Sequence, residues 1–555
     1  MFAGRIASCL TTSMRVLLLS AVALWCAGVP TVLGAELTLN VNNPAGSLIA
    51  QRAGDMKIEF GIPPQEKTGS AMLRTSLLRY DGDGALVSDP IASYQQAVTL
   101  TRQSVNATVS ITIPRAGLFL VDATLLSENG KAVASKRVNV AAMSPRGRSS
   151  FPDFGVVTHF AQGKGAPEVL LPLVKSAGFS WIRDEIYWDH IEQKPGVFVF
   201  PKDYDAYLNR ASKLGISPLI VLAYGNAKAY PELFGAEQSF PDSPEARRFF
   251  VRYVDEVVRR YGQMVTHWEV WNEPAFARLG YAGYVALLKP VYMQIKERSP
   301  QATVISCGGG GAGGGPGGDC LLEMSKSGAL DYQDAFSVHP YMSPHIPETG
   351  YPTAGGPIAS VSIPTAWPYL VQLTGQHPRT DGRRVQLWIT ELGWPSSPAS
   401  AALDPTSQAA YLVRSYLLSR RYAGVTVMFW YDFVDDGNDP SNQEDNFGML
   451  RNDLSPKPAY VASAVLNATL GSRKWHSALV DDENVKVFQY GNSEPVIVGW
   501  TTANTARVVS VQVPAGKYVQ RDWQGAESQV TADGAGLKWR LGPLPSYLLP
   551  EAVVR

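Results

Sequence analysis

Short apolar runs alternate with longer segments of helical period between residues 149 and 465, and this alternation constrains the fold more than any other feature of the chain. Such alternation is typical of parallel strands that are joined by crossover helices. Eight apolar runs occur, which is the number of strands that closes a (β/α)8 barrel. The runs cover residues 155–158, 181–183, 217–222, 266–271, 303–306, 335–338, 386–390 and 426–430.

Stretches in which apolar and polar residues alternate flank the predicted barrel on both sides. Residues 36–148 contain runs such as Leu37–Val41 and Val109–Ile113, and we expect an antiparallel sandwich of about six to eight strands there. Residues 466–555 alternate again without a segment long enough for a helix, which predicts a small β module. The sequence therefore predicts an α/β chain in which a (β/α)8 barrel, residues 149–465, lies between two β modules.

The first residues of the chain have the pattern of an export signal. Arg5 and Arg15 precede an apolar run from Val16 to Val29, and small residues follow near Ala35. This order is typical of a secretory signal peptide, so we expect residues 1–35 to be removed when the protein reaches the periplasm or the medium. The apolar run is short for a membrane span, and a retained N-terminal anchor is the alternative.

Cys307 and Cys320 are the two cysteines that follow the predicted signal peptide, and they bracket a stretch, Gly308–Gly318, that is almost pure glycine. A disulfide between them would restrict this loop in an oxidising compartment, and we predict that pairing. Two unpaired thiols are the alternative, because a zinc site needs more ligands than this spacing offers. The glycine stretch lacks the Lys-Ser/Thr pair that grips a phosphate, so we expect neither a nucleotide nor another cofactor.

The charge of the chain excludes one class of partner. The formal net charge is zero at neutral pH, and Lys and Arg are scattered rather than gathered in stripes. Nothing in this distribution favours contact with a phosphate backbone, so we expect no nucleic acid partner.

Two glutamates stand at the ends of the fourth and seventh apolar runs, Glu273 within Trp-Asn-Glu-Pro and Glu391 within Thr-Glu-Leu-Gly-Trp-Pro. Catalytic groups of (β/α)8 barrels lie at the carboxyl ends of the strands. Strands four and seven lie on opposite sides of the barrel mouth, so the two carboxylates would face each other, as hydrolysis of a glycosidic bond by two carboxylates requires. A structural ion pair is the alternative for each glutamate. Glu269 lies earlier in the same strand as Glu273, and we expect it to be structural.

The motif Trp271–Pro274 after strand four, together with a lone glutamate after strand seven, resembles glycoside hydrolase clan A. A second stretch resembles the segment between strands two and three of these enzymes; it contains Trp188, Ile191, Glu192, Pro195, Gly196 and Phe198. Within the clan the chain is most similar to family 39 and its relatives, which include PslG-like bacterial endoglycosidases that trim self-produced exopolysaccharide. The resemblance covers the barrel and not its flanks.

This resemblance implies a retaining β-glycosidase that acts on a polysaccharide or oligosaccharide, and we expect the protein to be a monomer. Glu273 would be the general acid/base, with a raised pKa, and Glu391 the nucleophile, with the carboxyl groups about 5 to 5.5 Å apart. Asn272 would hydrogen-bond the 2-hydroxyl of the substrate. A non-catalytic carbohydrate-binding protein and a retaining transglycosylase are the alternatives.

Further residues at the strand ends are candidates for supporting roles. His339 and Tyr341 resemble the groups that orient the nucleophile, with packing as the alternative. Arg183 could hold Glu391 through a charge-assisted hydrogen bond. Trp430 could form an aromatic floor under the sugar, or belong to the core. The other candidates for substrate contact are His159, Asn226 and Trp394.

An acidic loop follows the eighth apolar run. Its spacing differs from that of a calcium-binding loop, so we predict no metal there. A solvated surface and a distal sugar subsite are the two interpretations that remain. The acidic residues of the loop are Asp435, Asp436, Asp439, Glu444 and Asp445.

Overall fold

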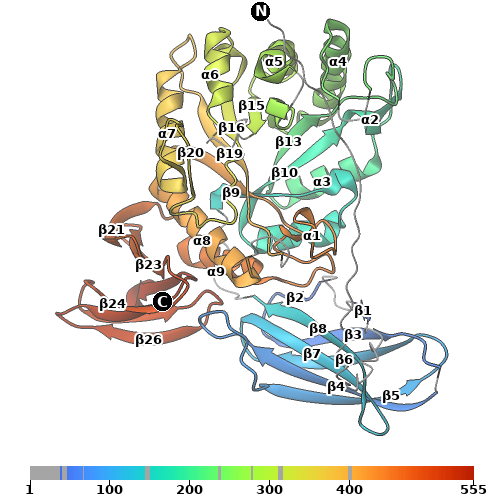
Figure 1. Cartoon of the computed structure of the whole chain (residues 1–555), viewed down its shortest axis with the longest axis vertical. Coiled ribbons are helices and arrows are strands. Elements are labelled where there is room, and N and C mark those ends of the chain that lie inside the picture. Colours follow the sequence, from blue (N-terminus) through green and yellow to red (C-terminus); the bar gives the residue numbers. More distant parts are fainter. Residues whose placement is uncertain are drawn as a thin grey trace, which may run out of the picture.

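A computed structural model describes the protein over residues 38–40, 47–66, 68–143, 151–235, 239–276, 279–309, 317–397 and 403–554. The predicted signal peptide, residues 1–35, lies outside this described part. Within it, none of the helices combines the length and the apolar character that crossing a membrane requires. Figure 1 shows three modules: a blue N-terminal sandwich, a central barrel, and a red C-terminal β module.

Eight parallel strands close the barrel in the order β10-β13-β14-β15-β16-β19-β20-β9. Each predicted apolar run overlaps one of them, and the predicted (β/α)8 fold with flanking β modules is confirmed. The barrel strands are β9 (Phe151–Val157), β10 (Phe179–Tyr187), β13 (Ser217–Ala223), β14 (His267–Val270), β15 (Thr303–Gly309), β16 (Ala335–Val338), β19 (Gln386–Leu392) and β20 (Val425–Trp430).

Helices surround the barrel, and α4 shows how the sequence specifies them. The side chain of Ser243 accepts a hydrogen bond from the amide of Ala246, Pro244 occupies the first turn, and Phe250 and Val254 are buried on one face. The helices are α1 (Pro167–Ser176), α2 (Trp188–Ile191), α3 (Lys202–Lys213), α4 (Pro244–Tyr261), α5 (Gly280–Arg298), α6 (Asp319–Lys326), α7 (Ile363–Gln376), α8 (Pro405–Arg421) and α9 (Pro458–Leu470). Short strands in the loops are β11 (Glu192–Lys194), β12 (Val197–Phe198), β17 (Tyr351–Pro352) and β18 (Ser360–Val361).

The N-terminal module is a sandwich of two sheets, with strand orders β1-β3-β6 and β2-β8-β7-β4-β5. Alternate residues of β6 face the core between the sheets, as the period-two pattern requires. The strands are β1 (Thr38–Asn40), β2 (Ile49–Ala50), β3 (Gly54–Ile62), β4 (Gly69–Arg79), β5 (Ala92–Leu100), β6 (Val105–Ile113), β7 (Gly117–Ser127) and β8 (Ala132–Ala142).

The C-terminal module contains a six-stranded sheet, β21-β22-β23-β28-β25-β26, and the pair β24-β27. The boundary predicted after residue 465 is wrong by several residues, because it falls inside α9, which runs to Leu470. Helix α9 is buried almost all round and packs with the barrel's outer layer. The strands are β21 (Trp475–Asp481), β22 (Val485–Tyr490), β23 (Val496–Thr501), β24 (Arg507–Val511), β25 (Gly516–Arg521), β26 (Glu527–Ala532), β27 (Leu537–Leu541) and β28 (Ser546–Pro550), followed by α10 (Glu551–Val554).

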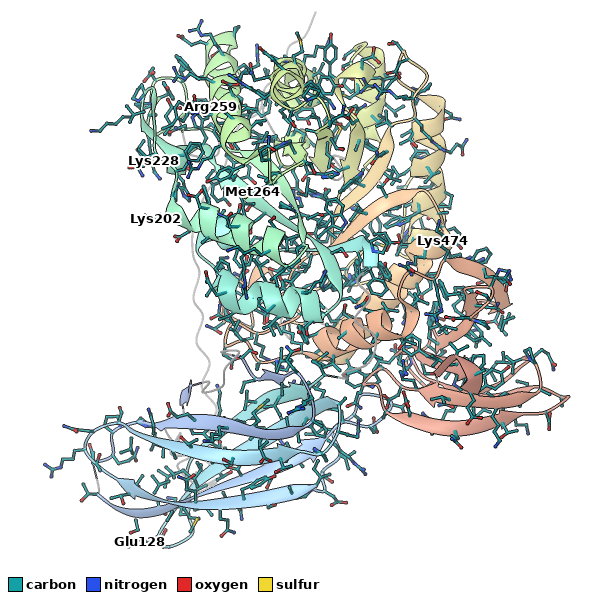
Figure 2. The ribbon with its side chains drawn as sticks, turned by 180° about the vertical axis from the view of Figure 1, so that it is seen from behind. Glu128, Lys202, Lys228, Arg259, Met264 and Lys474 are labelled. Carbon is teal, nitrogen blue, oxygen red and sulfur yellow. A yellow bond between two sulfur atoms is a disulfide. The ribbon has the colours of Figure 1, made fainter. Side chains whose placement is uncertain are left out.

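Buried contacts attach both β modules to the barrel. The core around the barrel helices continues into Leu118 of the sandwich and Trp500 of the C-terminal module. The indole of Trp500 donates a hydrogen bond of 2.8 Å to Glu348, which also accepts one of 2.8 Å from Arg414 of α8. Figure 2 shows the molecule from behind, with Lys474 where the C-terminal module begins. The three modules therefore share buried surface.

Candidate active site

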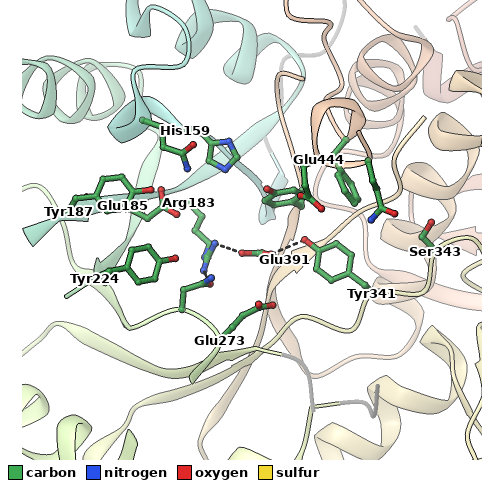
Figure 3. Close-up of a pocket in the computed structure, with 15 residues that line it drawn as sticks. His159, Arg183, Glu185, Tyr187, Tyr224, Glu273, Tyr341, Ser343, Glu391 and Glu444 are labelled. Atoms are coloured by element: carbon green, nitrogen blue, oxygen red, sulfur yellow. Dashed lines mark hydrogen bonds and ion pairs between the residues drawn. The ribbon is translucent and has the colours of Figure 1, made fainter. Parts of the chain in front are cut away.

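A cavity of about 430 Å³ lies at the carboxyl ends of the barrel strands (Figure 3). Its wall includes residues that belong to, or directly follow, β9, β10, β13, β14, β16, β19 and β20. Four carboxyl groups line it, and they come from Glu185, Glu273, Glu391 and Glu444. The barrel thus gathers polar side chains from distant parts of the sequence at one place.

Glu273 and Glu391 lie close together in this cavity. One carboxylate oxygen of each, with a ring nitrogen of His339, lie within 4.8 Å of one another. The side chain of Glu391 is 10% exposed, whereas that of Glu273 is 32% exposed. Glu391 is therefore the deeper carboxylate, and Glu273 is the one that an entering molecule reaches more easily.

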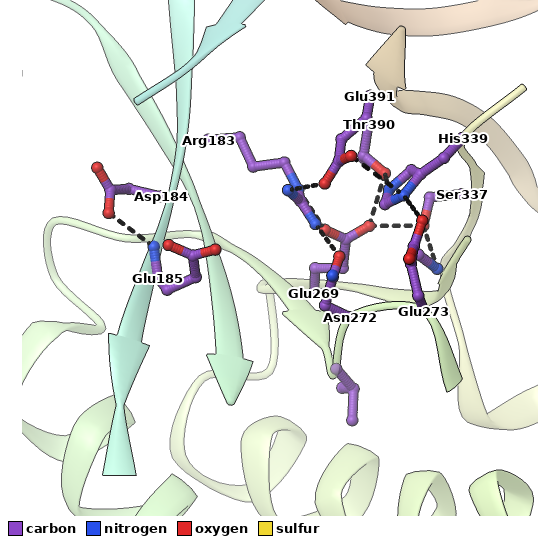
Figure 4. Close-up of polar contacts among 12 residues, drawn as sticks. Arg183, Asp184, Glu185, Glu269, Asn272, Glu273, Ser337, His339, Thr390 and Glu391 are labelled. Carbon is purple, nitrogen blue, oxygen red and sulfur yellow. Dashed lines mark hydrogen bonds and ion pairs between the residues drawn. The ribbon is translucent and has the colours of Figure 1, made fainter. Parts of the chain in front are cut away.

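Arg183 links the residues around Glu391 through all parts of its guanidinium group (Figure 4). Its Nη1 donates to Glu391 at 2.7 Å, Nε to Glu269 at 2.7 Å, and Nη2 to Asn272 at 2.8 Å. Burial lowers the pKa of Arg183, but the charges of Glu269 and Glu391 outweigh this effect and raise it above its ordinary value. Arg183 is therefore a permanent cation, and the hydrogen bond expected between Arg183 and Glu391 is present.

Glu269 lies behind the cavity wall, where it accepts several hydrogen bonds of this network, and it does not line the cavity. It is fully buried and also accepts hydrogen bonds from Ser337 at 2.6 Å and Thr390 at 2.8 Å. Glu269 therefore ties β14 to β10, β16 and β19, which accords with the structural role expected for it.

Tyr341 holds the second oxygen of the deeper carboxylate. Its hydroxyl donates to Oε2 of Glu391 at 2.8 Å, while Arg183 holds Oε1. Burial, and secondarily the charge of Glu391, keep the pKa of Tyr341 well above its ordinary value, so this hydroxyl retains its proton. Figure 3 shows Glu391 between these two partners. Two hydrogen bonds to different oxygens fix the plane of the carboxylate.

His339 lies nearer to Glu273 than to Glu391. Its Nδ1 is 3.1 Å from Oε1 of Glu273 and 3.5 Å from Oε2 of Glu391. Burial raises the pKa of Glu273, but the hydrogen bond and charge of His339, together with the charge of Arg183, outweigh burial and lower it. The expectation of a raised pKa at Glu273 is therefore wrong for the unliganded protein, because His339 and Arg183 stabilise the carboxylate.

A charged histidine stands on another part of the cavity wall. Nδ1 of His159 is 2.7 Å from Asp436 and 3.7 Å from Asp432, and Lys164 contacts the same oxygen of Asp436 at 2.8 Å. Burial alone would lower the pKa of His159, but the hydrogen bond to Asp436 and the charge of Asp432 raise it to about 9. His159 is therefore an imidazolium at neutral pH.

No protein-family model and no curated protein matches the sequence. Among solved structures, a family 39 glycoside hydrolase from the gut symbiont Bacteroides cellulosilyticus WH2 is 34% identical, with a TM-score of 0.79 over 93% of this chain and 100% of that chain. The chain belongs to glycoside hydrolase family 39. The relationship predicted from the sequence is confirmed, and this family 39 protein is a glycosidase.

Two more distant structures share the fold of this family 39 protein. A family 39 enzyme from Xanthomonas axonopodis pv. citri is 16% identical, and a monomeric beta-xylosidase from Caulobacter crescentus CB15 is 18% identical. Each has a TM-score of 0.50 and matches 73% of this chain, over 96% and 98% of the other chains.

Three residues predicted as candidates for substrate contact lie outside the cavity of this family 39 protein. Trp430 and Trp394 are fully buried and stack on each other, with ring centroids 5.8 Å apart. Asn226 is buried and bonds backbone groups of Glu192 and Ala229. Substrate contact by Asn226 and Trp394 is therefore not what the structure shows, because each side chain is already packed or hydrogen-bonded within the protein, and Trp430 takes its alternative place in the core.

The position of Trp430 follows from the alternation of side chains along a strand. Val427 and Phe429 of β20 belong to the cluster inside the barrel, and Tyr431 packs against it. Trp430, between them, belongs to the outer core beneath the helices. Tyr431 and not Trp430 is therefore the aromatic residue of this strand end that lines the cavity.

Several residues of the cavity wall are not among those predicted from the sequence. Glu185 and Tyr187 follow Arg183 at intervals of two along β10, so the strand period placed them on the same side. Tyr224 and Tyr431 each come directly after a barrel strand. Glu444 was named from the sequence as part of the acidic loop, with a solvated surface or a distal sugar subsite as its interpretations, and the path of this loop brings it to the cavity wall.

The backbone at Glu273 is held in an uncommon conformation. Trp271 and Glu273 have φ values of 67° and 49°, in the left-handed region that side chains other than glycine rarely adopt. The amide of Glu273 donates to the carbonyl of Gly308 at 2.5 Å. A Cβ atom at Gly309 would lie 3.1 Å from Cα of Glu273, so a residue without a side chain allows this close approach.

A disulfide joins Cys307 to Cys320 beside this contact, linking the end of β15 to the start of α6. Most of the glycine stretch between them, residues 310–316, lies outside the described residues. The backbone that receives the amide of Glu273 is thus covalently tied to the next helix.

Among the described residues, two clusters offer ligand atoms that could hold a cation, Glu273 with His339 and Glu391, and His159 with Asp432 and Asp436. In the first cluster the carboxylates already accept hydrogen bonds from Arg183, Tyr341 and His339. In the second, the ring of His159 and the ammonium group of Lys164 already bind Asp436. Partners within the protein therefore account for Glu273, Glu391 and Asp436, whereas among the described residues no donor hydrogen-bonds the buried carboxylate oxygens of Asp432.

Proposed function

We propose that this glycosidase cleaves β-linked polysaccharide with retention of anomeric configuration, through a covalent glycosyl-enzyme. The observation that carries the proposal is the separation of less than 4.8 Å between oxygens of Glu273 and Glu391. Inverting enzymes keep their carboxyl groups about 6.5 to 9.5 Å apart so that a water molecule fits between them, whereas retaining enzymes keep them about 5 to 5.5 Å apart. The short separation supports direct attack by a carboxylate.

In the first step, Glu391 attacks the anomeric carbon and the bond to the leaving oxygen breaks, while Glu273 donates a proton to that oxygen. Arg183 and Tyr341 hold the two oxygens of Glu391, so the nucleophile enters the reaction already oriented. The greater exposure of Glu273 supports its role as the acid, because the leaving group departs toward solvent.

In the second step, Glu273 removes a proton from water as the water oxygen attacks the anomeric carbon and releases Glu391. Its neighbour His339 lies within hydrogen-bond reach, at 3.1 Å. Arg183 donates to the side-chain oxygen of Asn272, so the side-chain nitrogen is the donor of this residue; it hydrogen-bonds Tyr224 and has a second hydrogen for the 2-hydroxyl of the sugar. That contact strengthens as positive charge develops on the sugar ring.

We further infer an exported enzyme that acts within the chains of a bacterial exopolysaccharide. The signal-like N-terminus and the disulfide between Cys307 and Cys320 both support an oxidising compartment. Polymers of this kind lie outside the cytoplasm, which is where an exported endoglycosidase would meet them.

The test uses full-length protein and purified exopolysaccharides of the host. Glu391→Gln should lower the release of reducing ends by roughly 10³-fold or more, because the amide cannot form the glycosyl-enzyme. Glu245→Gln is the matched control, since Glu245 is exposed on α4 and pairs only with a neighbouring arginine. A 2-deoxy-2-fluoro glycoside should leave a mass adduct on the peptide that contains Glu391.

Other outcomes separate the alternatives. Products longer than the substrate would indicate a transglycosylase, and first-formed products of inverted configuration would rule out the double displacement. Full activity of Glu391→Gln would remove this residue from the mechanism.

A further inference from the structure

Glu185 is a carboxyl group of the cavity wall that neither step of the proposed reaction uses. It lies near the end of β10 and lines the cavity with its side chain almost fully buried. Figure 3 shows it on the wall opposite Tyr341 and Ser343, with Glu391 between the two sides. A carboxyl group in this position faces a sugar that is seated for attack by Glu391.

The strand fixes the direction of this side chain. Arg183, Glu185 and Tyr187 alternate along β10 and all line the cavity. Asp184 points to the other side, where it accepts hydrogen bonds of 2.8 Å from Thr158 and from the amide of Phe160. The polar groups that satisfy Asp184 are therefore out of reach of Glu185.

One oxygen of Glu185 has no hydrogen-bond partner. Among the described residues, no donor lies within reach of its buried Oε2. Burial raises the pKa of Glu185, while the charges of His159 and Arg183 act in the opposite direction. A buried polar atom without a partner is costly to the folded protein. The last torsion of a glutamate is soft, so either oxygen can turn toward a ligand in the cavity.

The other charges of the cavity restrict what this ligand can be. Four carboxyl groups line the wall. Among the described residues of the wall, the cations are Arg183 and His159. Arg183 is engaged by Glu269 and Glu391, and His159 by Asp436. A negatively charged sugar would find no cation that is free of a carboxylate partner. A neutral sugar or one with an ammonium group meets no such repulsion.

We propose that Glu185 is a specificity-determining residue that accepts hydrogen bonds from hydroxyl or ammonium groups of the sugar attacked by Glu391, so that this subsite takes neutral or amino sugars and rejects uronic acids. The inference rests on the proposed function, because it places the sugar within reach of Glu391. It adds the substrate class, which the two catalytic glutamates do not determine.

The first experiment identifies the sugar that occupies this subsite. After cleavage of an exopolysaccharide, that sugar is the new reducing end, because it is the residue that was bound to Glu391. The enzyme digests a polymer that contains neutral, amino and uronic sugars, and the new reducing ends are then reduced with borodeuteride. Mass spectrometry of the labelled ends identifies the sugar directly. Neutral or amino sugars at the labelled ends support the inference, and uronic acids there overturn it. If no polymer is cleaved, the proposed function itself fails, and the inference fails with it.

The second experiment tests the residue. Glu185→Gln keeps the shape of the side chain, and we expect kcat/KM on the same polymer to fall by about 10-fold to 100-fold, as for loss of a hydrogen bond to a charged group. The melting temperature should stay the same or rise, because a buried charge without a full set of partners is removed. Glu245→Gln on α4 is again the control.

A structural role would give a different pattern. If the melting temperature falls together with kcat/KM, Glu185 stabilises the barrel and the inference is overturned. Activity within 3-fold of the parent would overturn it as well. Should Glu185→Gln fold poorly, the reducing-end analysis of the parent enzyme still decides the substrate class.

Discussion

The hydroxyl of Thr390 orders the hydrogen bonds of His339 in the candidate active site. This hydroxyl donates to Oε1 of Glu269 at 2.8 Å, and a hydroxyl has only one hydrogen to give. It therefore accepts a hydrogen bond from Nε2 of His339 at 2.9 Å. Nδ1 of His339 therefore faces Glu273, and one hydrogen bond joins this nitrogen to Oε1 of the carboxyl group. The residue beside the proposed nucleophile thus orders the hydrogen bonds of the proposed acid, Glu273.

A first prediction follows for the pH dependence of catalysis. His339 lowers the pKa of Glu273, so His339→Ala should raise it. Because a general acid must be protonated, the alkaline limb of the profile of kcat/KM against pH should move to higher pH. Profiles measured on one polymer test this, with the exposed His476→Ala as the control. A limb that stays in place or moves to lower pH would contradict the assignment.

At the scale of elements, the segment between β20 and α9 depends on one buried ion pair. Lys457 donates to Asp435 at 2.6 Å and also binds Ser396 and the carbonyl of Asn446. Both members of the pair are almost fully buried. The same segment supplies Tyr431, Gln443, Glu444 and Phe447 to the cavity wall. The pair therefore holds the shape of one side of the active site.

Lys457→Met should weaken both stability and substrate binding. It leaves the carboxylate of Asp435 buried without its cation, which costs about 3 to 5 kcal/mol in free energy of unfolding. KM should rise more than kcat falls, because the catalytic glutamates lie on other elements. Denaturant unfolding and steady-state kinetics measure the two effects. Lys202→Met on α3 is a control at an exposed lysine. Unchanged stability would show that Asp435 is neutralised in another way.

The eight barrel strands were predictable because each is an apolar run long enough to be recognised by itself. The contact of Arg183 with Glu391 was predictable because the predicted runs placed both residues at the mouth, although β10 continues beyond Arg183 to Tyr187. The aromatic floor predicted at Trp430 is not there, because a shift of one residue along a strand reverses the side that a side chain faces. The position of Glu444 at the cavity could not be predicted, because it depends on a buried ion pair between residues that are far apart in the loop.

At the scale of the whole molecule, the two β modules also contact each other. In Figure 1 they lie side by side next to the barrel. Gln524 of the C-terminal module donates to the carbonyl of Tyr80, and Arg540 pairs with Asp83, at 3.0 and 2.5 Å. Each module thus packs on the barrel and on the other module, and we expect the three to unfold together.

Trp500→Ala tests this expectation. The indole is fully buried in the core shared with the barrel, so its loss should cost about 3 to 5 kcal/mol. Unfolding by guanidinium, followed by far-UV circular dichroism and by activity, should shift as one transition. Asp83→Ala removes an exposed ion pair and should cost less than about 1 kcal/mol. Separate transitions for structure and activity would show that the modules unfold independently.

The disulfide beside Glu273 has a practical consequence for anyone who produces this protein. A chain made in a reducing cytoplasm contains Cys307 and Cys320 as thiols, and can be soluble and have the expected mass. Neither property reports on the backbone at Gly308, which receives the amide of Glu273. In protein without residues 1–35, and hence without Cys9 and Cys26, a titration that finds no free thiol is therefore the criterion of quality that each preparation should meet before the kinetics of two variants are compared.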